Sequence, residues 1–260
     1  MATGIPTGQR VVFAFDFDGV VCDSARENSL TTWRALRANW PDRLPVDPPD
    51  GLLETYIECR PAIETGYQNI PLMWQLIGGA TPAEILGNFD TLVEEIMDRE
   101  GLTNPDLERM FGAARDEWLA ENCDSWLDAQ GFYPGIVDAI NRVAARAVII
   151  TTKQHRFALE LVARAGINIA PDCVFGLERL GNGGKKSVLE DLLAANPQAE
   201  VHFFEDRLKT LERVVDLART RLYLVDWGYN TPDERAEGEA MSAVQLISLS
   251  GFAELLEQHA

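Results

Sequence analysis

Several side chains able to do acid–base or metal chemistry stand directly behind short apolar runs of the sequence. In an open parallel sheet, ligands bind beyond the carboxyl ends of the strands, so residues in this position are expected to meet at one edge. They comprise carboxylates, hydroxyls and two ammonium groups, the latter at the start of a helix behind a glycine-rich stretch. In chain order they are Asp16, Asp18, Thr151, Thr152, Lys185, Lys186, Glu205 and Asp206.

Carboxylates gathered at one sheet edge repel one another and raise each other's pKa unless a cation neutralises them. A hard divalent ion with oxygen ligands, Mg²⁺ first, meets that need. Together with a lysine and a hydroxyl, such an ion stabilises the charge that spreads over a phosphoryl group during its transfer. A carboxylate that does not hold the metal can attack phosphorus and form an acyl phosphate. The residue set therefore favours phosphoryl chemistry.

Alternating strand-like and helical patterns predict the elements that would position these residues. The first apolar run, 11–15, is continuous, which is typical of a strand buried on both faces. Towards the C-terminus such runs alternate with single helices, and this argues for a parallel α/β sheet with both faces covered. The expected later strands are 147–150, 173–175, 201–204, 222–225 and 244–247, and the expected helices include 157–165, 187–195, 208–218 and 252–257.

The segment between the first and second expected strands is helical instead. A capping box with proline at the first helical position begins one of its helices at Thr81. Residues from 42 to 62 are rich in proline and acid and are interpreted as a connection. No strand is expected within this segment. We therefore expect a helical insertion, residues 24–134, in a core made of residues 1–23 and 135–260.

Four stretches, in this order, resemble the motifs of the haloacid dehalogenase superfamily. FDFDGVV at 15–21 is similar to the first motif, in which an aspartate nucleophile is followed two residues later by an acid/base aspartate. VIIT at 148–151 resembles the second motif, Lys185 or Lys186 the third, and FFED at 203–206 the fourth. VDWGY at 225–229 further resembles a strand and loop near the end of the phosphoglycolate-phosphatase-like members.

This resemblance implies a Rossmann-like α/β core, with the all-helical insertion acting as a mobile cap over the active site. It implies Asp16 as the nucleophile and Asp18 as the acid that protonates the leaving alcohol and then activates water. Thr151 would hydrogen-bond the phosphoryl oxygens, and Lys185 would neutralise charge on the phosphate and the nucleophile. Mg²⁺ would be held by Asp16, the backbone carbonyl of Asp18, and Asp206.

Two features leave assignments open. The fourth motif of the family is often glycine–aspartate with another aspartate four residues later, whereas here Glu205 stands in the glycine position and Thr210 in the later one. Acidic pairs occur in the family, so Glu205 is a candidate metal ligand, with a purely structural role as the alternative. Lys185 fits the helix spacing of the third motif slightly better than Lys186 does, and both remain candidates.

Within the superfamily, the residues favour cleavage of a phosphate ester. A dehalogenase needs no proton donor two residues after the nucleophile, so Asp18 argues against that reaction. The phosphonate hydrolases of the family form a Schiff base on a cap lysine, and no lysine stands between residues 25 and 134. We expect a Mg²⁺-dependent phosphomonoesterase that forms an aspartyl phosphate. The alternatives are a phosphomutase of the same superfamily and a catalytically weak relative serving as a binding or regulatory protein.

Substrate choice would come largely from the insertion. Arg60 could hold a second anionic or hydroxyl-bearing end of the substrate, with Glu64 beside it, or the two could pair with each other on the surface. Thr152 and Lys186 are further candidate substrate-binding residues in the core. A capped, dry site favours a small phosphate ester, such as a sugar phosphate or a phosphorylated organic acid.

Composition limits the partners. Acidic residues outnumber basic ones 41 to 23, and the formal net charge of −18 repels nucleic acid and anionic lipid. No apolar run approaches the ~18 residues of a membrane span. The four cysteines form no C-x-x-C pair and indicate reduced thiols. We therefore expect a cytoplasmic protein, a monomer or homodimer, that binds neither nucleic acid nor membrane.

Overall fold

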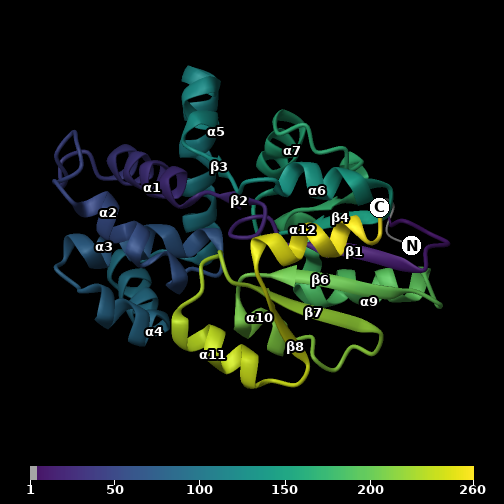
Figure 1. The fold of residues 1–260 in the computed structure, drawn as a ribbon. Helices are drawn as coiled ribbons and strands as arrows, with labels where there is room; N and C mark the ends of the chain where they lie inside the picture. The colour runs from purple at the N-terminus through teal and green to yellow at the C-terminus, as the bar shows by residue number, and fades with distance from the viewer. Residues whose placement is uncertain (1–4) are drawn as a thin grey trace. The chain divides into compact units, whose positions relative to one another are not determined.

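The computed structural model describes residues 5–260, and these divide into two compact units (Figure 1). The first unit contains Phe132–Ala260 together with the described residues up to Asp23, and the second unit is Ser24–Gly131. The chain therefore leaves the first unit after Asp23 and returns to it at Phe132. Each unit has a cluster of buried apolar side chains of its own.

The first unit is built on a six-stranded sheet in the order β5-β4-β1-β6-β7-β8. All neighbouring strands pair in parallel, and β1 lies between β4 and β6. The α/β fold with a parallel sheet is thus confirmed. The strands are β1 (Val11–Phe15), β4 (Ala147–Ile150), β5 (Val174–Phe175), β6 (Glu200–Glu205), β7 (Thr220–Val225) and β8 (Val244–Ile247).

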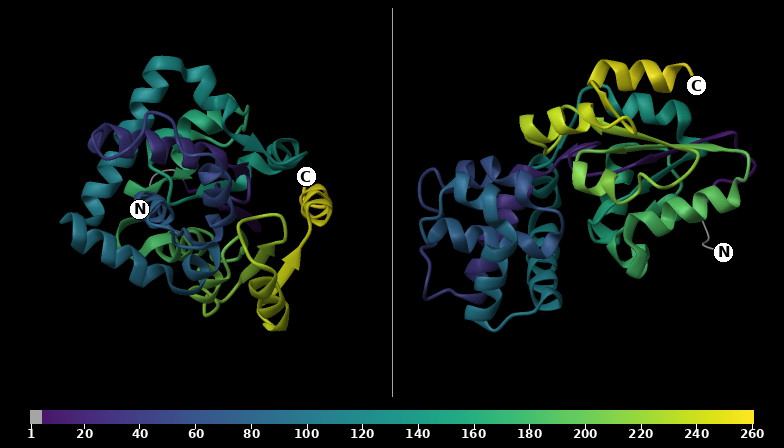
Figure 2. Two further views of the ribbon diagram at one scale, coloured as in Figure 1. Left: turned by 90° about the vertical axis from the view of Figure 1, so that its left-hand side faces the viewer. Right: turned by 90° about the horizontal axis from the view of Figure 1, so that it is seen from below.

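Alternate residues of β1 bury themselves against different helical layers. Phe15 packs against Phe252 of α12 (Leu249–Glu257), with 5.6 Å between the ring centroids. Val12 and Ala14 instead belong to the cluster that includes Leu189 of α9 (Gly184–Ala195). Figure 2 shows the sheet between these two layers. Burial on both faces explains why the sequence of β1 is apolar without alternation.

The remaining helices of this unit are α6 (Ile136–Val143), α7 (His155–Arg164), α8 (Leu177–Leu180), α10 (Leu208–Glu212) and α11 (Pro232–Ala240). The helix expected over 208–218 is wrong in length. Beyond Glu212 the backbone bonds run to the third preceding residue, from Val214 N to Leu211 O and from Leu217 N to Val214 O, so the chain continues in turns.

The second unit is almost entirely helical. Its elements are α1 (Ala25–Asn39), α2 (Leu52–Glu58), η1 (Arg60–Ala62), η2 (Gly66–Gln68), α3 (Asn69–Ile77), α4 (Pro82–Glu100) and α5 (Asn104–Asp128). The capping box expected at Thr81 is present, with the Glu84 N–H donating to Thr81 Oγ1. Two expectations are wrong. The stretch 42–62 contains α2 and η1, and a short strand β3 (Gly131–Phe132) pairs with β2 (Cys22–Asp23).

Helix α2 forms because its apolar residues find partners within the unit. Tyr56 is fully buried, and Leu52 and Leu53 pack against the same cluster as Trp33 and Leu36 of α1. A seven-residue helix gains little from its own hydrogen bonds, so tertiary packing decides whether it exists. Within residues 5–260, no helix has the length and apolar character needed to cross a bilayer.

Candidate active site

The loop behind β1 brings two aspartates to the carboxyl edge of the sheet. Asp16 follows the last residue of β1, and its backbone N–H donates to Phe204 O of the neighbouring β6 at 2.9 Å. The chain then turns sharply, with the Gly19 N–H donating to Cys22 O at 2.8 Å and Gly19 at φ +89°. This turn holds Asp18 against the same edge of the sheet.

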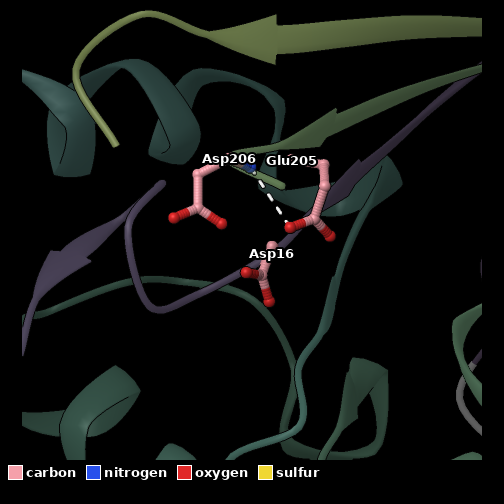
Figure 3. A group of neighbouring side chains, drawn as sticks. All are labelled: Asp16, Glu205 and Asp206. Carbon is pink, nitrogen blue, oxygen red and sulfur yellow. Dashed lines mark hydrogen bonds between the residues drawn. The ribbon is translucent and has the colours of Figure 1, made fainter. Parts of the chain in front are cut away.

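Three carboxylates meet where β1 and β6 end (Figure 3). Asp16, Glu205 and Asp206 are all buried, and one oxygen from each lies within 4.8 Å of the others. Glu205 is the last residue of β6, and its Oε1 accepts the Asp206 N–H at 3.2 Å. Figure 3 shows the three carboxyl groups turned towards one another. They come from chain segments almost 190 residues apart, brought together by the parallel pairing of β1 and β6.

One ammonium group bridges two of these carboxylates. Lys185 Nζ lies 2.7 Å from Asp16 Oδ1 and 2.7 Å from Glu205 Oε2. Burial raises the pKa of Asp16 to about 6, against the opposing effect of Lys185. Burial, followed by the charge on Asp16, raises the pKa of Glu205 well above its usual range. Burial acts to lower the pKa of Lys185, but the two carboxylates outweigh it and the pKa is raised.

These residues fit a divalent metal ion. When all three carboxylates are ionised, Lys185 leaves two negative charges uncompensated in a buried site, which is costly without a further cation. The donors are all carboxylate oxygens, the ligands that Mg²⁺ takes in proteins. Burial is the main cause of the raised pKa values of Asp16 and Glu205, and the charges of neighbouring carboxylates add to it.

Thr151 comes from the end of β4, the strand that pairs with β1. It follows β4, is buried, and donates its backbone N–H to Phe175 O at 2.9 Å. Its Oγ1 accepts the backbone N–H of Lys153 at 3.1 Å. Thr152 is half-buried in the bend that follows the strand.

Of the two lysines left open by the sequence, the structure brings Lys185 to the carboxylates. Lys186 lies on the outside of α9, where its Nζ contacts both carboxylate oxygens of Asp216 at 2.7 and 2.8 Å. The exposed side chain of Asp216 marks this pair as a surface ion pair. Neighbouring helical residues differ by about 100° in direction, which separates the two side chains.

Two groups that the sequence did not assign lie at the same edge. Lys153 Nζ lies 3.2 Å from Asp18 Oδ1, and the lysine side chain is fully buried. The loop behind β7 holds Asp206, since the Tyr229 N–H donates to Asp206 Oδ2 at 2.8 Å and Asn230 Nδ2 donates to Asp206 O at 2.9 Å. The sequence signal for Lys153 was its position two residues behind Thr151. The signal for the loop behind β7 was Gly228, a glycine that follows a strand.

Arg60 and Glu64 lie in the helical unit. Arg60 is 7% exposed, and its Nη1 donates to Ile63 O at 3.0 Å. Glu64 is half-buried, and its backbone N–H donates to Gln68 Oε1 at 2.7 Å. The burial of Arg60 is at odds with the alternative of a surface pair between these two side chains.

Solved structures share this architecture over almost the whole chain. A protein from Haemophilus somnus described as a predicted phosphoglycolate phosphatase is 14% identical, with a TM-score of 0.58 over 96% of this chain and 97% of that one. A haloacid dehalogenase-like hydrolase family protein from Streptococcus pneumoniae is 12% identical, with a TM-score of 0.57 over 96% and 99% of the two chains. A haloacid dehalogenase superfamily hydrolase from Geobacter sulfurreducens is 13% identical, with a TM-score of 0.53 over 96% and 98%.

At the level of sequence, no protein-family model and no curated protein matches. The similarity to the solved structures is therefore one of fold, at 12–14% identity. The resemblance drawn from the four motifs is confirmed at that level. This chain has the haloacid dehalogenase-like fold.

Proposed function

We propose that the protein is a Mg²⁺-dependent phosphomonoesterase that works through an aspartyl phosphate on Asp16. The observation that carries this proposal is the buried group of Asp16, Glu205 and Asp206, with Lys185 bridging the first two. Asp18, two residues from Asp16, supplies an acid and base beside it. The phosphatase and hydrolase names of the similar structures support the same reaction class.

The first step transfers the phosphoryl group to the protein. An oxygen of Asp16 bonds to phosphorus while the bond from phosphorus to the ester oxygen breaks, and Asp18 gives its proton to the departing oxygen. Lys185 holds Asp16 in place through its 2.7 Å contact and offsets negative charge on the attacking group. Thr151 supplies a hydroxyl that can bond a phosphoryl oxygen. The products are a free alcohol and an acyl phosphate.

The second step restores the enzyme. A water molecule gives a proton to the Asp18 carboxylate and attacks the acyl phosphate, which releases inorganic phosphate and returns Asp16 as a carboxylate. Asp16, Glu205, Asp206 and the backbone carbonyl of Asp18 are the groups proposed to hold Mg²⁺. When bound, this ion would neutralise negative charge on the phosphoryl oxygens and on the surrounding carboxylates.

The substrate is proposed to be a small phosphorylated metabolite, either a sugar phosphate or a phosphorylated organic acid. We further propose that Ser24–Gly131 is the cap that selects it, with Arg60 and Glu64 as candidate selecting residues and Thr152 as a core contact. Lys186 is not included, because it is engaged with Asp216. The cytoplasmic location and the monomeric or homodimeric state stay predictions.

Hydrolysis of p-nitrophenyl phosphate tests this proposal. We expect activity with Mg²⁺, its loss with EDTA, and a fall of at least about 10⁴-fold in Asp16→Asn. The matched control is Asp138→Asn, an exposed aspartate of α6, which should leave the rate unchanged. Acid quenching during turnover should give a phosphorylated protein in the parent and not in Asp16→Asn. A parent rate that Asp16→Asn does not alter would overturn the proposal.

A further inference from the structure

Lys153 is a buried cation whose position is fixed at both ends. Its backbone N–H donates to Thr151 Oγ1 at 3.1 Å, and its backbone carbonyl accepts the Leu177 N–H at 2.9 Å. Its side chain is fully buried, so the ammonium group has left water and needs an anionic partner in the protein. That partner is Asp18, whose Oδ1 lies 3.2 Å from Lys153 Nζ.

Both charged groups of the ion pair have unused hydrogen-bonding capacity. Neither Lys153 Nζ nor Asp18 Oδ1 makes a hydrogen bond to any group within residues 5–260, although both atoms are buried. Buried polar atoms of this kind are uncommon in folded proteins and point to a missing partner. Asp18 is thus held by charge, with its remaining bonding capacity open to an incoming group.

The two aspartates of the loop behind β1 each have their own lysine. Lys185 contacts Asp16, and Lys153 contacts Asp18. Only four of the 23 basic residues in the chain are lysines, and two of those four are buried at this edge of the sheet. A lysine is a compact point charge with three donors on a flexible stem, so it can approach a buried carboxylate closely.

We infer that Lys153 is a positioning residue that holds the Asp18 carboxyl where the ester oxygen of the substrate departs. This inference rests on the proposed phosphatase function and adds a residue to it. Lys153 acts through Asp18: the proton moves from Asp18 to the departing oxygen while the phosphorus–oxygen bond breaks, and Lys153 itself exchanges no proton. Without the ammonium group the carboxyl loses its fixed direction, and protonation of the leaving group suffers.

The dependence of the rate on the leaving group isolates this step. p-Nitrophenolate departs with little need of a proton, whereas phenolate is more basic and depends more on general acid catalysis. We therefore expect Lys153→Met to raise the ratio of kcat/KM for p-nitrophenyl phosphate to kcat/KM for phenyl phosphate by at least about 10-fold. The matched control is Lys209→Met, an exposed lysine of α10, which should leave the ratio at the parent value.

The Asp18→Asn variant shows whether Lys153 positions Asp18 or binds the phosphate directly. Asp18→Asn should raise the same ratio alone, and adding Lys153→Met to Asp18→Asn should not raise it further. Lys153→Met could instead lower kcat/KM by the same factor for both esters, and do so again when Asp18 is already Asn. That result would mean that Lys153 binds the phosphoryl group, and it would overturn the inference. An unchanged ratio in Lys153→Met would overturn it as well.

Folding is checked by circular dichroism and thermal melting of each variant. If Lys153→Met does not fold, Lys153→Gln carries the same test, because it removes the charge and keeps a polar head group. Failure of the proposed function has a different signature. In that case the parent itself shows no Asp16-dependent hydrolysis of either ester, and the inference falls with it.

Discussion

Burial governs the chemistry of the carboxylates at the residue scale. Asp16 is buried at the sheet edge, and this burial raises its pKa from the usual 3.8 to about 6. The charges of Asp206 and Asp18 add to this effect, while Lys185 opposes it. A carboxylate in this state is poorly solvated and gains from any cation that reaches it. In the proposed reaction, the same burial favours both metal binding by Asp16 and its attack on phosphorus.

The raised pKa of Asp16 predicts a pH-dependent response to Mg²⁺. A carboxyl whose pKa is higher in the folded chain than in the unfolded chain binds its proton more tightly when folded, so its contribution lowers stability as the pH rises from about 4 through about 6. Mg²⁺ held as proposed would compete with that proton. We expect Mg²⁺ to raise the Tm clearly at a pH of about 7.5 and little at a pH of about 5.

Thermal melting with and without millimolar MgCl₂ at the two pH values checks this prediction. Asp16→Asn removes the titrating group and should reduce the Mg²⁺-induced shift at the higher pH. A shift of equal size at both pH values would contradict the assignment of Asp16 as a metal-side carboxylate. CaCl₂ serves as a comparison, because its oxygen ligands and charge are alike while its size differs.

The sequence indicated which residue types gather at the sheet edge, because polar residues directly behind a buried strand have few other places to go. Asp16 and Asp206 are examples. It favoured Lys185 over Lys186 only slightly, since adjacent positions in the first turn of a helix carry nearly the same local signal. Only the direction of each side chain separates them. The position of Lys153 just past the second motif suggested that it could face the pocket, but nothing local to that residue indicates that Asp18, 135 positions earlier, lies beside it.

At the scale of elements, two loops hold Asp206 by close packing. A Cβ on Gly19 would overlap the Asp206 carboxylate, and a Cβ on Gly228 would lie 2.6 Å from Gly19 O and overlap Asp206 Cβ. The same loops are tied by the Trp227 Nε1 donor to Val20 O at 3.1 Å. The loop behind β1 and the loop behind β7 thus fit only when glycine occupies both positions.

Gly19→Ala should therefore damage the site. Its φ of +89° adds backbone strain to the overlap with Asp206. We expect kcat/KM for p-nitrophenyl phosphate to fall about 100-fold, since displacement of a site group by about 1 Å costs that much. The matched control is Gly8→Ala, at φ +71° with open space around its Cβ, which carries similar strain and should keep the rate. Equal rates in the two variants would contradict this account.

The helical unit depends on a buried ion pair that spans two helices. Glu27 of α1 is fully buried and accepts hydrogen bonds from Nε and Nη2 of Arg115 of α5, at 2.8 and 2.7 Å. It also accepts Nε1 of Trp126 at 3.0 Å. Arg115 and Trp126 lie on opposite sides of a break in α5 at Asn122, where φ is −160° and ψ is 86°. Glu27 therefore fixes the two halves of α5 to α1.

Removal of one partner should be costly. In Arg115→Met the charge of Glu27 stays buried and loses its main partner, so we expect the helical unit to lose about 3–5 kcal/mol of stability. The matched control is Arg109→Met, whose partner Asp106 pairs with it at the surface, with an expected change within about 1 kcal/mol. Urea unfolding followed by tryptophan fluorescence measures both. Similar midpoints for the two variants would mean that the buried pair contributes little.

For the whole molecule, the sequence predicted the alternation of strand and helix but not every local detail. The strands come from short apolar runs that are buried within the sheet. Helix α2 was not expected in the proline-rich stretch, because its stability comes from packing of Tyr56 into a cluster assembled by distant helices. Whether the helical unit acts as the proposed cap is a question for the whole chain, and an experiment that separates the two units answers it.

Excision of Ser24–Gly131 provides that experiment. The cut ends lie side by side, since the Tyr133 N–H donates to Val21 O at 3.4 Å, so a Gly/Ser linker of about four residues can join Asp23 to Phe132. The sheet unit has its own buried cluster and should fold alone. On the proposal that Ser24–Gly131 is the cap, we expect the shortened chain to keep slow, Asp16-dependent hydrolysis of p-nitrophenyl phosphate and to lose discrimination among phosphate esters, because a capless site would be open to water and would not contact the rest of the substrate. A shortened chain that folds and binds Mg²⁺ but is as selective as the parent would place substrate choice in the sheet unit instead.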